Sequence, residues 1–168
     1  MSQRNALYRW IFYGLAAGLF LLFQNMLLTR LQLWGIHPFL PPILAVMPAV
    51  WEDRQESLCA GAVFGLLCDL TIRPPIPCFY VLVFAAAAFL AGLISTRWIQ
   101  PGFFCALTAS LAALLLNGAF YALVFSVRGI NDMAASASIT GRELLLTLPL
   151  TPFVYLLFRH IRRRFPAD

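Results

Sequence analysis

Charged residues divide this sequence into six apolar windows, and the lengths of these windows constrain the fold more than any other feature. The windows cover residues 10–29, 31–51, 57–68 with 70–72 beyond Asp69, 74–96, 98–127 and 144–158. A helix needs about 20 apolar residues to cross the hydrocarbon core of a bilayer, and the first, fourth and fifth windows meet this length. The hydrophobic content is 61%, compared with about 45–50% in soluble domains. The sequence therefore predicts one all-α integral membrane domain over residues 1–168, a bundle of about six transmembrane helices.

The other three windows are less regular. The second is long enough to cross a membrane, but it contains four prolines, which should distort or interrupt a helix there. The third and sixth are short and span only if the flanking Arg73, Arg142 or Arg159 extend outward to the interface. Before the sixth window we expect a loop over residues 128–143, with a short helix capped by Asn131.

The arginines predict which side of the membrane each loop faces. All 12 basic residues are arginine, and they lie at the edges of the windows. Six spans place both termini on one side. If that side is the cytoplasm, eight arginines lie inside (Arg4, Arg9, Arg54, Arg97, Arg159, Arg162, Arg163 and Arg164) and four outside (Arg30, Arg73, Arg128 and Arg142). The positive-inside rule then favours cytoplasmic N- and C-termini. The same placement excludes a basic groove for nucleic acid.

The third window carries a pattern of small residues and one acid. Gly61, Gly65 and Asp69 follow one another at intervals of four, so they share one face of a helix. Glycines allow close approach of a second helix, either within this bundle or from a partner chain. For Asp69 we consider an ion pair with Arg73 one turn later, or a hydrogen bond to a partner helix or polar group at the outer interface.

Two further sets of polar residues are candidates for contacts. Asn117 is the deepest polar residue of the fifth window, and we expect it to form an interhelical hydrogen bond. Near the C-terminus, Arg159, Arg162, Arg163 and Arg164 form a basic cluster. Such a cluster fixes topology and contacts anionic lipid headgroups, with docking of a cytoplasmic protein as the alternative.

The sequence contains none of the short motifs that mark common catalytic or metal sites. There is no His-Glu-x-x-His, no Gly-x-Ser-x-Gly and no phosphate-binding loop, and the four cysteines lack the spacing of a metal site. We therefore expect no catalytic residue, no metal ion and no cofactor, which disfavours an intramembrane enzyme acting on lipid-linked substrates.

Three segments together resemble the rod shape-determining protein MreD family. The first is Gly61-x-x-x-Gly65-x-x-x-Asp69-Leu70, followed by a short turn and an alanine- and leucine-rich helix. The second is His37-Pro38-Phe-Leu, which leads through an apolar run to Trp51 and a charged turn. The third is the C-terminal stretch over residues 150–165. Together these segments cover about half of the chain, and the order and length of the remainder fit the family.

The resemblance implies a location and a set of partners. It places the chain in the bacterial cytoplasmic (inner) membrane as a multi-pass, non-catalytic scaffold subunit of the cell-wall elongation complex. Its direct partner would be an MreC-like membrane protein. The glycosyltransferase RodA and the elongation-specific penicillin-binding protein would be further partners, and the actin-like MreB an indirect one. The scaffold would help couple peptidoglycan synthesis to the MreB cytoskeleton.

A second function remains open from the sequence alone. Substrate-binding membrane subunits of energy-coupling-factor vitamin transporters are also small six-helix proteins. Such a subunit needs an outward pocket lined by polar groups, for which the sequence offers Asp69, Arg73, Asn131 and Asp132.

Overall fold

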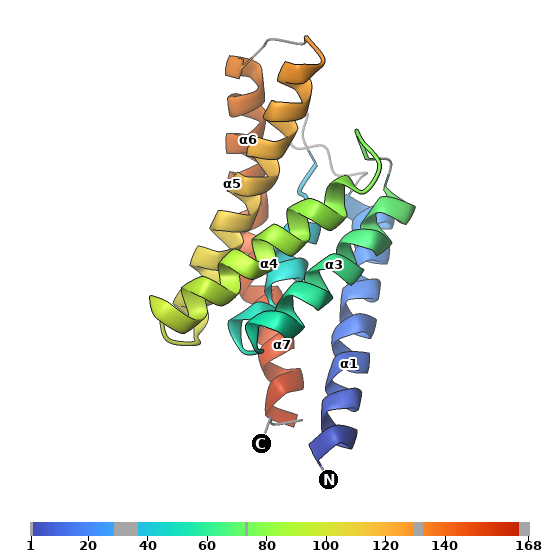
Figure 1. Ribbon diagram of the computed structural model, residues 1–168, viewed down its shortest axis with the longest axis vertical. Helices are drawn as coiled ribbons and strands as arrows, with labels where there is room; N and C mark the ends of the chain where they lie inside the picture. Colours follow the sequence, from blue (N-terminus) through green and yellow to red (C-terminus); the bar gives the residue numbers. More distant parts are fainter. Residues whose placement is uncertain (1, 29–36, 73, 130–132, 165–168) are drawn as a thin grey trace.

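The computed structural model describes residues 2–28, 37–72, 74–129 and 133–164, and these residues form helices and turns without any strand. In chain order the elements are α1 (Ser2–Phe23), the π-helical turn η1 (Gln24–Leu28), α2 (Pro41–Val46), the 3₁₀ turn η2 (Pro48–Val50), α3 (Arg54–Thr71), α4 (Phe79–Arg97), α5 (Phe103–Val127), α6 (Met133–Thr147), the 3₁₀ turn η3 (Leu148–Leu150) and α7 (Thr151–Arg164). The start of α1 and the end of α7 lie at the same end of the bundle, which we call the terminal end (Figure 1).

Among the described residues, four helical segments are long and apolar enough to cross a membrane, as expected of a membrane protein. They are Leu7–Met26, Phe79–Arg97, Phe103–Val127 and Ala137–Arg164. The last of these, 28 residues long, begins within α6 and continues through η3 and α7. Together with α2–η2 and α3, these segments match the six predicted windows in number and order.

The prediction of a loop with a short helix over residues 128–143 is correct only in part, because a helix does occur there but is much longer than expected. Helix α6 begins at Met133 and continues past Arg142 and Glu143 to Thr147. The window boundary had been set by those two charges, but charged residues are good helix formers and do not end a helix. Asn131, the expected helix cap, lies outside the described residues. The turn after α5 contains Gly129 with a positive φ of 78°, a conformation that glycine adopts without strain.

Helix α2 and turn η2 form the centre of the bundle, and every one of their residues is buried. The prolines of this window interrupt the helix, as predicted, because proline cannot donate the backbone hydrogen bond that a helix interior requires. The non-helical stretch before α2 is stabilised by two side chains from other elements. The Gln24 side chain donates to the Pro38 carbonyl oxygen and accepts from the Leu40 N–H, at 2.6 and 3.2 Å. The Phe39 N–H donates to the Thr147 hydroxyl at 3.1 Å.

Small side chains bring α4 and α5 close to this central segment. Six residues form one buried cluster: Val46, Ala49, Ala87, Ala91, Ala109 and Ala113. Alanine at these positions lets neighbouring helix backbones approach each other. At one end of the cluster, the Ser95 hydroxyl of α4 donates to the Val50 carbonyl oxygen at 2.8 Å, which fixes the end of η2 against α4.

Candidate functional site

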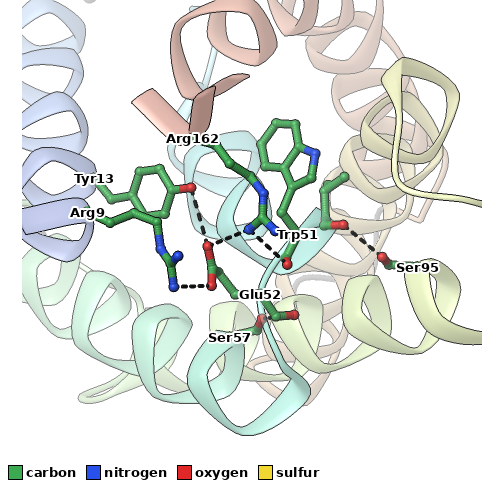
Figure 2. Close-up of polar contacts among 8 residues, drawn as sticks. Arg9, Tyr13, Trp51, Glu52, Ser57, Ser95 and Arg162 are labelled. Carbon is green, nitrogen blue, oxygen red and sulfur yellow. Dashed lines mark hydrogen bonds and ion pairs between the residues drawn. The ribbon is translucent and has the colours of Figure 1, made fainter. Parts of the chain in front are cut away.

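The most buried group of charges lies at the terminal end of the bundle, around Glu52 in the turn between η2 and α3. The Glu52 side chain is 3% exposed and receives two ion pairs. Arg9 Nη2 of α1 lies 2.8 Å from Oε2, and Arg162 Nη1 of α7 lies 2.9 Å from Oε1. The Tyr13 hydroxyl donates to Oε1 at 3.4 Å. Figure 2 shows these three side chains converging on one carboxylate.

Helical spacing places the partners of Glu52. Arg9 and Tyr13 lie four residues apart on α1, and Phe158 and Arg162 lie four residues apart on α7, so each pair shares a helix face. The Tyr13 and Phe158 rings stack with centroids 5.2 Å apart. This aromatic contact holds α1 against α7 one turn inside the ion pairs, and so aligns both arginines with the turn that carries Glu52.

The backbone of the same turn is also held by the cluster. Arg162 Nη1 donates to the Trp51 carbonyl oxygen at 3.1 Å, and the Ser57 hydroxyl donates to the Glu52 carbonyl oxygen at 3.4 Å. We call Arg9, Tyr13, Glu52, Ser57 and Arg162 the Glu52 cluster. It joins the first helix, the last helix and the start of α3.

The electrostatics of the cluster combine an unfavourable and a favourable effect. Burial raises the pKa of Glu52, and the positive charges of Arg9 and Arg162 oppose that shift. The two guanidinium groups and the one carboxylate leave one net positive charge within this set of three side chains. Arg9 is itself buried, and its Nε has no hydrogen-bond partner among the described residues.

The sequence interpretation did not identify the Glu52 cluster. It assigned Arg9 and Arg162 to membrane topology and used the charged turn after Trp51 only as part of the family resemblance. One sequence pattern could have indicated the cluster. An arginine and an aromatic residue lie four positions apart near the outer ends of both the first and the last helix. The sequence alone did not show that these helices meet at the same turn.

The predicted basic cluster near the C-terminus is therefore divided in the structure. Arg162 turns inward to Glu52, with a side chain 28% exposed, which corrects the interpretation of all four arginines as one surface cluster. Arg163 and Arg164 are exposed. The Arg159 guanidinium lies 6.0 Å from the centroid of the Tyr155 ring, in the range of a cation–π contact.

Gly61 and Gly65 lie in the contact between α3 and α4 of this same chain. A Cβ added at Gly61 would lie 2.7 Å from the Phe84 carbonyl oxygen. A Cβ added at Gly65 would lie 2.5 Å from the Tyr80 carbonyl oxygen. The two glycines thus allow close helix packing, but α4 occupies their face. This corrects the alternative in which the same face is open to a partner chain.

Asp69 joins α3 to the first turn of α4. Its Oδ1 accepts from the Tyr80 N–H at 3.0 Å, and its Oδ2 accepts from the Val81 N–H at 3.3 Å. The first N–H groups of a helix have no partner within the helix, and a carboxylate there also interacts favourably with the helix dipole. Asp69 therefore caps a neighbouring helix of its own chain. Its other predicted partner, Arg73, lies outside the described residues.

Asn117 is buried on α5, with an exposed fraction of 2%. Its Oδ1 has no hydrogen-bond partner among the described residues, so this atom does not form the predicted interhelical hydrogen bond. The next residue, Gly118, faces α6, where an added Cβ would meet the side chain of Thr140. Asn117 thus lies beside a close contact between α5 and α6.

The buried polar groups of this chain mainly connect one helix or turn to another. Within the described residues, no group of three histidine, cysteine, aspartate or glutamate side chains is placed to hold a metal ion. Comparisons of the chain with protein-family models, with curated proteins and with solved structures give no match.

Proposed function

We propose that this chain is a non-catalytic membrane scaffold subunit of the bacterial cell-wall elongation complex, similar to MreD. In this role it lies in the cytoplasmic membrane with both termini inside and binds an MreC-like membrane protein. RodA, the elongation penicillin-binding protein and, indirectly, MreB complete the assembly. The proposal rests on the sequence resemblance and on the use that the fold makes of its polar side chains.

The observation that carries the scaffold role is the Glu52 cluster. It connects α1, α7 and the start of α3 through buried ion pairs at 2.8 and 2.9 Å. Asp69 connects α3 to α4 at the other end of α3. A bundle held at both ends by such contacts keeps a fixed shape, which is what a subunit needs if it is to hold other membrane proteins in register.

The positions of the termini support the same proposal. The start of α1 and the end of α7 lie at one end of the bundle (Figure 1), as cytoplasmic termini require. The exposed Arg163 and Arg164 lie at that end, in agreement with the positive-inside rule.

The proposal is tested by depleting the protein in the bacterium that encodes it. Rod-shaped cells should become round, and wild-type protein should restore the rod shape. A membrane two-hybrid assay with the MreC-like protein of the same bacterium should give a positive signal. Cells that remain rod-shaped after complete depletion would contradict the proposal.

Mass spectrometry of the purified protein separates this function from vitamin transport. The elongation scaffold should carry no stoichiometric metabolite. A vitamin recovered at one molecule per chain, together with loss of vitamin uptake on depletion, would replace the scaffold proposal with the transporter function.

A further inference from the structure

A cavity of about 520 Å³ lies between α1 and α3, towards the terminal end of the bundle. Gly14 and Ala17 of α1 form one wall, Ala60 and Val63 of α3 form the other, and Leu44 of α2 lies at the base. We call this space the α1–α3 groove. Figure 1 shows the two helices that flank it. The Glu52 cluster holds α1 and α3 at the terminal end, so the groove has fixed walls.

The α1 wall of the groove has open space beside its glycine. A Cβ added at Gly14 would meet nothing within 4 Å. The same holds for Gly18, which lies one turn later on α1, beyond the residues that line the groove. These two glycines differ from Gly61 and Gly65, whose face is filled by α4. Small residues on facing walls allow a third helix to approach closely, whereas a flexible lipid chain adapts to side chains of any size.

The polar end of the groove indicates the charge of its occupant. Gln55 and Glu56 line the groove where α3 begins. Glu56 is exposed and forms no ion pair with any residue that the structure describes. The remaining lining is mostly apolar. A matching occupant is therefore an apolar helix with a positive charge at the flank that reaches Glu56.

We propose that the α1–α3 groove binds one membrane-spanning helix of another protein, which carries a lysine or arginine at the flank facing Glu56. This proposal rests on the scaffold function and assigns the surface that performs it. A second copy of this chain fits less well. A two-fold interface through the groove would bring Glu56 of one copy towards Glu56 of the other, and like charges repel.

The probe for this proposal is a synthetic helix of leucine and alanine, about 20 residues long with a central glycine. One form has lysine at both flanks and the other has glutamate. Each carries an acceptor dye and one cysteine placed a turn inside a flank. The full-length protein, with Cys59 replaced by serine and a donor dye on the exposed Cys78, is reconstituted in phosphatidylcholine vesicles. Binding is measured by energy transfer as the peptide concentration is raised.

We expect saturable binding of the lysine peptide and about threefold weaker binding of the glutamate peptide, as for an exposed ion pair. Gly14→Leu should weaken binding of the lysine peptide about tenfold because its side chain fills the groove. Gly141→Leu is the matched control, because Gly141 also has nothing within 4 Å of an added Cβ but lies on α6. Melting temperatures of both variants show whether they remain folded.

Disulfide cross-linking locates the bound peptide. The exposed Cys59 lines the groove, so oxidation should join it to the cysteine of the lysine peptide. The Cys59→Ser protein, which keeps Cys78, should give no such product. Equal binding of both peptides, or unchanged binding to Gly14→Leu, would overturn the proposal.

Two other occupants give distinct results. A phospholipid that co-purifies with the protein and that the peptide does not displace would assign the groove to lipid. A Cys59–Cys59 disulfide between two chains in the absence of peptide would assign it to a second copy. Restoration of the rod shape by wild-type protein does not depend on which surface of the chain binds its partner. Absence of peptide binding would therefore reject the groove proposal and would not affect the scaffold function. Peptide binding without any shape defect on depletion would reject the scaffold function alone.

Discussion

Arg162 and Glu52 lie 110 residues apart in the chain and are joined by a contact of 2.9 Å. This contact ties the last helix to the turn before α3, and Arg9 ties the first helix to the same carboxylate at 2.8 Å. The two ends of the chain are thus held through one buried acid. Four substitution experiments follow from this arrangement and from the contact between α3 and α4.

Replacing Glu52 with glutamine should destabilise the fold more than any other single change in the Glu52 cluster. The amide keeps the size of the side chain but leaves Arg9 buried without a counter-charge, which costs about 3–5 kcal/mol. Thermal unfolding in detergent, followed by circular dichroism, measures this effect. Asp53→Asn is the matched control, because Asp53 is the exposed neighbouring residue and makes no side-chain capping bond. Equal melting temperatures for the two variants would show that the cluster does not stabilise the bundle.

Arg162→Gln should lower stability by about 1.5–3 kcal/mol, the range for a hydrogen bond to a charged group. The loss is smaller than for Glu52→Gln because the Arg162 side chain is 28% exposed and Arg9 still pairs with Glu52. Arg163→Gln removes the same charge from the exposed neighbouring residue and should leave the melting temperature unchanged. Equal losses in both variants would point to an effect of net charge instead of the contact with Glu52.

The contrast between Arg162 and Arg163 also shows which features of the fold could be predicted from the sequence. Window lengths and prolines predicted the number and order of the apolar segments and the interruption of the second one, because these depend on local composition. The separation of Arg162 from the other arginines depends on where α7 meets the turn at Glu52. That contact is set by the packing of helices far apart in the chain, which local patterns do not encode.

Gly61, Gly65 and Asp69 also show that a local pattern does not identify the helix that packs against it. Their spacing predicted close packing on one helix face, and the structure places α4 there. The sequence left open whether a partner chain or this chain supplies the second helix. Charges were also a poor guide to helix ends, since α6 runs through Arg142 and Glu143.

Asp69→Ala should destabilise the bundle by about 1–2 kcal/mol, because the N–H groups of Tyr80 and Val81 lose their acceptors. Asp69→Asn should cost less, since its single amide oxygen still accepts one of the two hydrogen bonds. Thermal unfolding of both variants gives the comparison. An asparagine variant as unstable as the alanine variant would show that the negative charge at the start of α4, and not hydrogen bonding, is the main contribution.

Gly65→Ala should be the most damaging of three equivalent glycine substitutions. The new Cβ would lie 2.5 Å from the Tyr80 carbonyl oxygen and 2.7 Å from the Val81 Cα. Both are backbone atoms, so α3 and α4 must separate, at a cost of about 1–3 kcal/mol. At Gly118 the new Cβ meets only side-chain atoms of Thr140. A small shift of one side chain relieves this contact without separating two helix backbones, so Gly118→Ala should cost less.

Gly141→Ala is the control for both, because its new Cβ meets nothing within 4 Å. Alanine favours a helix by about 1 kcal/mol over glycine, so this variant should be as stable as the wild type or more stable. Melting temperatures should therefore rise in the order Gly65→Ala, Gly118→Ala, Gly141→Ala. A Gly65→Ala protein as stable as Gly141→Ala would mean that α3 and α4 do not touch at Gly65. Asp69 would then be too far from the first turn of α4 to cap it.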